Sequence, residues 1–114
     1  MNKRQLVEHF EEPNHMELYG DHSWYEPMKF IYTALYCALM RNYDTIIVSR
    51  NGFRFYTHGK LEDAFLGGEA PVPDPSYRNL LDEMMATDPN VAELCEEIVA
   101  TNDIETIIRV RCFS

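Results

Sequence analysis

The chain has 114 residues, of which 46% are hydrophobic and 25% charged, and its formal net charge is −9. This size fits one domain with one core, spanning residues 1–114, and the composition argues against a disordered chain. Three widely spaced cysteines without a Cys-x-x-Cys pair argue against a disulfide framework. The sequence shows no secretory signal and no apolar stretch long enough for a bilayer, so we expect a cytoplasmic protein without membrane contact.

Two helices are predicted at the start of the chain. The first covers residues 3–12, because Leu6, Val7 and Phe10 share one side and Pro13 ends the pattern. The second covers residues 24–41, where Ser23 and Glu26 have the spacing of a capping box. It is apolar nearly all round, which is typical of a central helix covered on more than one side.

A β-hairpin is predicted over residues 44–58. Asn51-Gly52 indicates a two-residue turn, which would place Val48 opposite Phe55. The inner face of the hairpin would then carry Ile46, Val48, Phe53 and Phe55. The outer face would carry Ile47, Arg54, Tyr56 and His58.

Three further elements are predicted in the second half of the chain. Residues 62–66 hold at most one helical turn before a proline-rich loop, and helices follow over residues 76–87 and 90–101. Residues 105–113 alternate as a strand, which we expect to join the hairpin, since isolated hairpins are only marginally stable. The sequence therefore predicts an α+β fold in which a three-stranded antiparallel sheet packs on four helices.

The acidic charge is concentrated in one segment. Residues 60–105 hold twelve acidic residues against Lys60 and Arg78, a net of −10, while the rest of the chain is nearly neutral. Such a segment repels phosphate backbones and attracts basic surfaces, so we expect a protein partner with a basic surface and no direct nucleic-acid contact. The acidic candidates for that contact are Glu69, Asp74, Asp82, Glu83, Asp88, Glu93, Glu96 and Glu97.

The last three of these acids would lie on one face of the helix predicted over residues 90–101. A row of such charges is able to imitate phosphates and to steer the chain onto a basic site. The alternative is a solvated helix face that serves only solubility.

The outer face of the predicted sheet is the second candidate binding surface. Arginines interleaved with aromatic side chains suit the gripping of carboxylates or stacking. Its candidate residues are Arg54, Tyr56, His58, Arg109, Arg111 and Phe113. An ordinary solvated sheet face is the alternative, and the exposed edges of a three-stranded sheet also allow a homodimer.

Catalytic and metal-binding patterns are absent from the sequence. Cys37 sits among apolar residues, which makes a thiol inert. His9, His15 and His22 form neither H-x-x-x-H nor H-E-x-x-H. We therefore expect no enzymatic activity, no metal and no cofactor.

In its small size, its localised acidic charge and its lack of catalytic motifs, the chain resembles phage anti-defence proteins such as anti-CRISPRs, and bacterial immunity proteins. This is a likeness of composition that identifies no individual residue. It implies stoichiometric inhibition of a nucleic-acid-handling target. A binding module or homo-oligomeric subunit that uses the outer sheet face is the alternative function.

Overall fold

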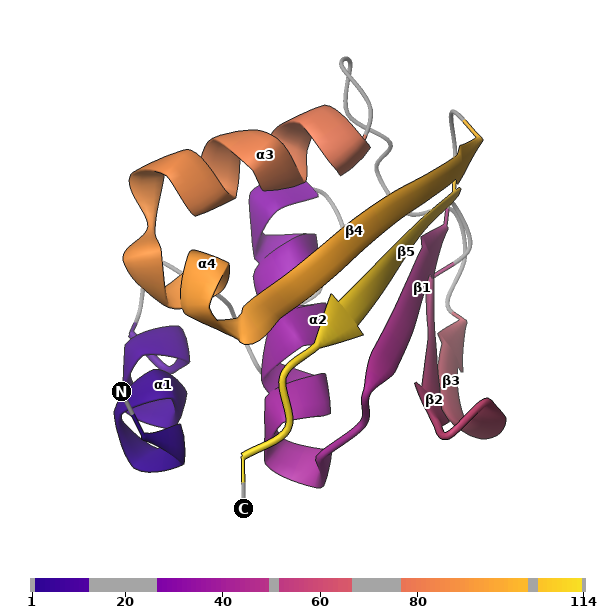
Figure 1. Ribbon diagram of the computed structural model, residues 1–114, viewed down its shortest axis with the longest axis horizontal. Helices are drawn as coiled ribbons and strands as arrows, with labels where there is room; N and C mark the ends of the chain where they lie inside the picture. The colour runs from indigo at the N-terminus through magenta and orange to yellow at the C-terminus, as the bar shows by residue number, and fades with distance from the viewer. Residues whose placement is uncertain (1, 13–26, 50–51, 67–76, 103–104, 114) are drawn as a thin grey trace.

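The computed structural model describes residues 2–12, 27–49, 52–66, 77–102 and 105–113 (Figure 1). In chain order, the elements are α1 (Lys3–Phe10), α2 (Pro27–Arg41), β1 (Thr45–Ser49), β2 (Gly52–Thr57), β3 (Lys60–Leu66), α3 (Tyr77–Thr87), α4 (Pro89–Leu94), β4 (Cys95–Asn102) and β5 (Glu105–Val110). The strands form one antiparallel sheet in the order β3-β2-β1-β5-β4. The α+β class is confirmed. Among the described helices, none is both long enough and apolar enough to cross a membrane.

The sheet has five strands rather than the three that the sequence predicts. The C-terminal strand does join the hairpin, where β5 pairs with β1. The first additional strand, β3, replaces the helical turn expected near residues 62–66, and it pairs with β2. His58 and Gly59, with φ of 52° and 80°, form the tight turn between β2 and β3. Positive φ at two successive residues is the geometry of a type I′ turn, which is common in two-residue hairpins.

The helix predicted over residues 90–101 is the main error in the expected fold. Helix α4 ends at Leu94, and from Cys95, whose backbone is extended, the chain continues as β4 beside β5. Val91, Leu94, Cys95 and Ile98 follow a helical spacing, yet Ile98 and Val99 are adjacent β-branched residues that favour a strand. Pairing with β5 supplies backbone hydrogen bonds that favour the strand over the helix.

The register of the β1–β2 hairpin differs from the expected one by two residues. Val48 pairs with Phe53 rather than with Phe55, and Ser49 pairs with Gly52. The expected turn residue Asn51 lies outside the described residues. Because side chains alternate with a period of two, a shift of two residues leaves both faces as predicted.

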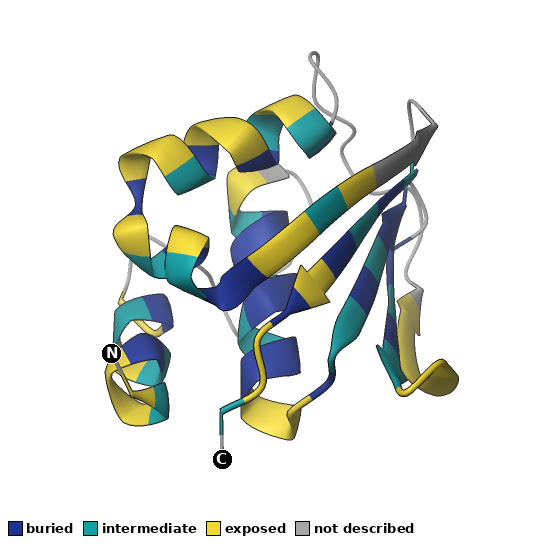
Figure 2. Ribbon diagram, in the orientation of Figure 1, coloured by how far each residue is buried: buried dark blue, intermediate teal, exposed yellow. Residues whose placement is uncertain are grey.

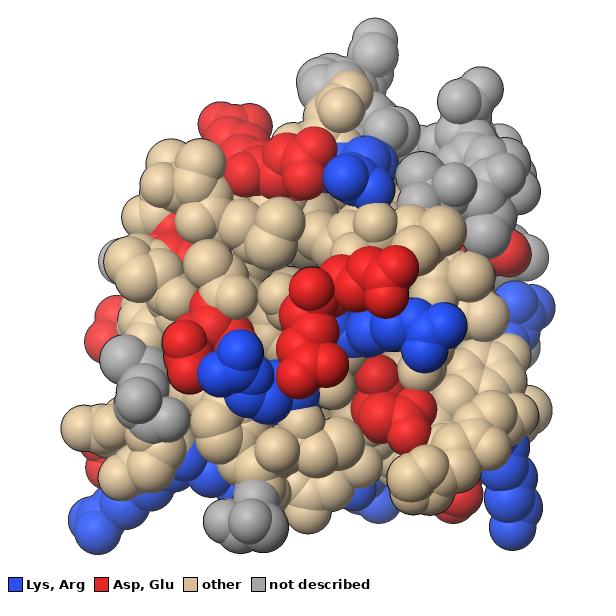
Figure 3. Space-filling view, in the orientation of Figure 1, with Lys and Arg blue, Asp and Glu red and all other residues tan. Residues whose placement is uncertain are grey.

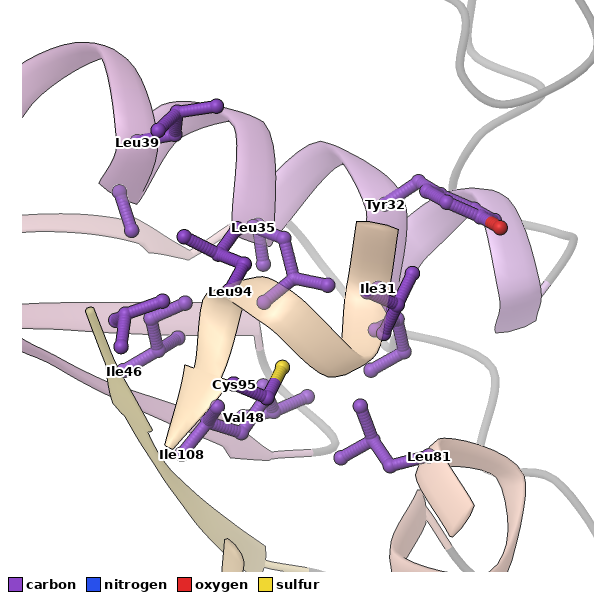
Figure 4. Close-up of a cluster of buried hydrophobic side chains, with 14 of the residues drawn as sticks. Ile31, Tyr32, Leu35, Leu39, Ile46, Val48, Leu81, Leu94, Cys95 and Ile108 are labelled. Atoms are coloured by element: carbon purple, nitrogen blue, oxygen red, sulfur yellow. The ribbon is translucent and has the colours of Figure 1, made fainter. Parts of the chain in front are cut away.

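The core lies between the inner face of the sheet and α2. Ile31 and Leu35 of α2 point toward the side of the sheet that carries Ile46 of β1 and Ile108 of β5, whereas Leu39 extends from another side of α2, and all five side chains are buried (Figure 4). Around α2, α1 contributes Leu6 and Phe10, α3 contributes Leu81 and Met84, and α4 contributes Val91 and Leu94. The helices therefore gather on one side of the sheet (Figure 1).

The two edges of the sheet differ in how they meet solvent. At the β4 edge, the Arg78 guanidinium of α3 donates a 2.6 Å hydrogen bond to the Ile98 carbonyl oxygen, and Asp82 lies 3.3 Å from Arg78 Nε. Strand β4 also has register irregularities at both ends. Such devices protect an edge from pairing with another chain. At the β3 edge, every side chain from Lys60 to Phe65 is exposed (Figure 2).

Replacing Arg78 by alanine is expected to lower the free energy of unfolding by about 1.5 kcal/mol, because a charge-assisted hydrogen bond to a half-buried carbonyl is lost. Arg4→Ala is the matched control, since Arg4 also has an acidic partner four residues later, Glu8, but is almost fully exposed. We expect a change below about 0.5 kcal/mol for that control. Urea unfolding followed by circular dichroism measures both, and equal effects would contradict the role of Arg78 at the edge.

Candidate functional site

The outer face of the sheet carries two rows of side chains that cross the strands. The pairing registers place Arg54, Ile47, Ile107 and Val99 side by side in one row. They place Leu61, Tyr56, Thr45, Arg109 and Glu97 in the next row. Directly opposed side chains lie about 5 Å apart on one face, so each row is a continuous surface. We call Ile47, Arg54, Tyr56, Val99, Ile107 and Arg109 the outer-face patch.

The centre of the outer-face patch is apolar and only half covered. Ile47, Tyr56 and Ile107 are half-buried although the described helices pack on the other side of the sheet. Val99 is 39% exposed and Leu61 is 52% exposed. A hollow of about 570 Å³ opens here, and its lining includes Thr45, Ile47, Tyr56, His58, Ile107 and Arg109. An apolar strip with a charged border is the usual anatomy of a protein-binding surface.

Asp44, which the sequence analysis did not single out, fixes one end of this hollow. Its carboxylate accepts hydrogen bonds from the His58 backbone N–H at 2.7 Å and from Thr45 Oγ1 at 2.8 Å. Its backbone carbonyl accepts from the Val110 N–H at 2.9 Å. Burial opposes ionisation of Asp44, but the hydrogen bonds from His58 and Thr45 outweigh it and lower its pKa. Asp44 therefore holds the start of β1, the β2–β3 turn and the end of β5 together.

The structure places only part of the predicted sheet-face set on the outer-face patch. Arg54, Tyr56 and Arg109 lie on it. His58 lies in the β2–β3 turn beside the hollow. Arg111 follows the end of β5, and Phe113 packs against the core instead of pointing outward. The prediction failed at Phe113, because β5 ends at Val110 and the strand alternation no longer applies there.

Three of the predicted acidic residues are paired with arginines rather than presented as a row. Arg111 lies 2.8 Å from Glu93 and 3.7 Å from Glu96, and Arg109 lies 3.3 Å from Glu97. The single helix face expected for these acids is wrong, since only Glu93 is helical. Figure 3 shows acidic and basic side chains next to one another over β4 and β5. The two candidate surfaces thus meet here, and each reduces the net charge of the other.

The remaining acidic candidates are scattered. Asp82 and Glu83 are exposed on α3, where Asp82 pairs with Arg78. Asp88 is only 8% exposed and belongs to the interior. Glu69 and Asp74 lie outside the described residues.

Asp88 is the centre of a network between three helices. Its Oδ2 accepts a 2.6 Å hydrogen bond from the Tyr32 hydroxyl of α2 and lies 2.7 Å from His9 Nε2 of α1. Its Oδ1 accepts from the Asn90 N–H, which caps the N-terminus of α4. Burial opposes ionisation, but the bonds from Tyr32, His9 and Asn90 prevail and lower the pKa of Asp88. Burial and the Asp88 carboxylate raise the pKa of Tyr32. These contacts give the network a structural role.

Metal-binding and nucleophilic groups are not assembled in the described ranges. Among those residues, no three His, Cys, Asp or Glu side chains are arranged to hold a metal, and His15 and His22 lie outside them. Burial raises the pKa of Cys95 to about 12, and burial also raises the pKa of Cys37. Burial, with Asp44 and Glu96 nearby, raises the pKa of Cys112 as well. Raised thiol pKa values disfavour the reactive thiolate.

The three thiols are expected to react with iodoacetamide in the order of their exposure. Cys112 is exposed, Cys37 is half-buried and Cys95 is buried. We expect Cys95 to react more than about tenfold more slowly than Cys112 in the folded protein and at the same rate in urea, because access limits it. Peptide mass spectrometry over a time course measures the order. Rapid labelling of Cys95 without urea would contradict the burial described above.

The fold and the outer-face patch together define a small α+β protein with a sheet face on which none of the described helices packs. Comparison with family models, with curated proteins and with solved structures finds no match for this chain.

Proposed function

We propose that this chain works by stoichiometric binding of a protein partner on its outer-face patch. The observation that carries the proposal is the row of Ile47, Ile107 and Val99, which joins three strands into one apolar strip on the face opposite the described helices. Burial of such a strip removes apolar surface from water, which is the main driving force of protein association.

The charges around the strip indicate the chemistry of the partner. Arg54 extends the apolar row, is half-buried, and makes no ion pair with any described residue. Arg109 borders the strip but already has Glu97 as its partner. A partner surface with an apolar centre and a carboxylate opposite Arg54 is therefore complementary, and the planar guanidinium favours a bidentate pair with it. Tyr56 beside this arginine adds a residue type enriched at interface hot spots.

Occlusion of a basic, nucleic-acid-handling surface by acidic residues is the alternative function. Its support is the net charge of −10 over residues 60–105. The pairing of Glu93, Glu96 and Glu97 with arginines and the burial of Asp88 weaken it, because compensated or buried charges attract a basic partner poorly.

A comparative capture experiment tests the proposal. The wild-type chain, the sheet variant Arg54→Ala/Tyr56→Ala and the α3 variant Asp82→Asn/Glu83→Gln are immobilised separately and exposed to the same lysate, and the retained proteins are compared quantitatively by mass spectrometry. We expect at least one protein that the wild type and the α3 variant retain and the sheet variant does not. Identical sets of retained proteins would overturn the proposal, and retention lost only with Asp82→Asn/Glu83→Gln would favour the acidic alternative.

A further inference from the structure

The β3 edge, with a cavity on the inner side of the sheet, lies apart from the outer-face patch. As described above, Arg78 covers part of the β4 edge, whereas the side chains of β3 from Lys60 to Phe65 are all exposed. An edge strand directs alternate backbone N–H and C=O groups away from its neighbour, and these groups are able to pair with another strand. The fold therefore covers part of the β4 edge by a contact from another element, whereas the described part of β3 has a register shift opposite Phe55 and Tyr56 and a 2.9 Å hydrogen bond from the Ala64 N–H to Asp63 Oδ1.

A cavity of about 270 Å³ adjoins this open edge, between α2 and the inner faces of β2 and β3. Its helical wall is formed by Thr33, Cys37 and Arg41, which follow one another at intervals of four residues and so share one side of α2. Its strand wall is aromatic. The Phe53 and Phe65 rings are stacked with centroids 6.2 Å apart, and Phe65 is 52% exposed. The cavity is large enough for one aliphatic or aromatic side chain.

We propose that β3 binds an extended peptide segment of a protein partner as a sixth strand, with one apolar side chain in the cavity between α2 and β3. Side chains of an added strand alternate between the two faces, so every second residue of the peptide would lie on the inner side where the cavity opens. Backbone pairing supplies affinity in this mode, and the pocket for an alternate side chain supplies specificity.

The charges at the edge define the peptide further. Glu62 and Asp63 are exposed, and neither forms an ion pair with a described residue. Asp63 also lines the cavity. Two carboxylates without an ion pair at this edge favour lysine or arginine next to the apolar anchor of the peptide, although Asp63 also accepts a 2.9 Å hydrogen bond from the Ala64 N–H and Arg41 stands on the helical wall of the cavity. They disfavour a second copy of this chain as the occupant, since pairing β3 with itself would bring four carboxylates together.

Selection from displayed random peptides of about eight residues, a typical strand length, tests the inference on the full chain. We expect enriched peptides with an apolar residue flanked by basic ones. Synthetic versions should shift the backbone amide resonances of residues 60–66, and N-methylation of alternate peptide residues should abolish binding because it removes the strand hydrogen bonds. Asp63→Lys should weaken binding about tenfold, whereas Glu83→Lys, an identical charge change on α3, should leave it within about twofold.

Several results would overturn the inference. One is a selection that enriches no peptide above background. A second is that the enriched peptides shift the amide resonances of β4 or of the outer-face patch instead of those of β3. A third is that N-methylated peptides still bind. A concentration-dependent dimer in sedimentation, with shifts confined to residues 60–66, would replace the peptide with a second copy of the chain.

Discussion

Replacing Asp88 by alanine is expected to lower the free energy of unfolding by about 3 kcal/mol. The substitution removes the cap of α4 and leaves the Tyr32 hydroxyl, which is buried, without its 2.6 Å acceptor. It also removes the contact with His9, which links α1 to α4. Urea unfolding at pH 7 measures the change. Asp82→Ala on the exposed face of α3 is the control, and we expect less than about 0.5 kcal/mol there. Similar values for the two variants would contradict the network.

The same carboxylate is expected to make stability depend on pH. The pKa of Asp88 is lowered in the folded state. Its stabilising contribution is therefore complete above the ordinary aspartate pKa of about 4, and it is lost as the pH falls through the folded-state value. Asp88→Asn keeps a good capping residue but does not titrate, so its stability should change less between pH 5 and pH 2 than that of the wild type.

Truncating Arg54 and Tyr56 of the outer-face patch is expected to weaken partner binding about 100-fold, since two hot-spot residues at roughly 1.4 kcal/mol each give that factor. The variant is Arg54→Ala/Tyr56→Ala. It removes the guanidinium that we expect to bind a carboxylate of the partner, and it removes the contact area of the Tyr56 ring. Both side chains are half-buried and outside the core. The variant should therefore fold, and its circular dichroism spectrum and unfolding midpoint are compared with those of the wild type.

Local patterns predicted much of the fold because they coincide with the packing. The residues of α1, α2 and α3 repeat at helical spacing, and the alternation of β1 and β2 assigned both faces of the hairpin correctly. Strand β3 was missed because all its described side chains are exposed from Lys60 to Phe65, so it shows no alternation. Gly59 was the available signal for the turn before it. Strand β4 was missed because its register with β5 is a long-range property that a helical spacing around Leu94 conceals.

The candidate site was predictable only in part for the same reason. Arg54, Tyr56 and Arg109 follow from strand alternation alone. The contact of Arg109 with Glu97 depends on β4 being a strand, so the two candidate surfaces could not be recognised as neighbours. The sequence did not distinguish Asp88 from the other acidic residues of its segment, because its burial depends on α1 and α2, which lie far from it in sequence.

The most direct test of the proposed function is calorimetric titration of the purified partner, identified by comparative capture, into the wild type and two variants. We expect Arg54→Ala/Tyr56→Ala to raise Kd about 100-fold and Asp82→Asn/Glu83→Gln to leave it within about threefold. A Kd unchanged by the sheet variant and raised by the α3 variant would contradict binding through the outer face and would support the acidic surface instead.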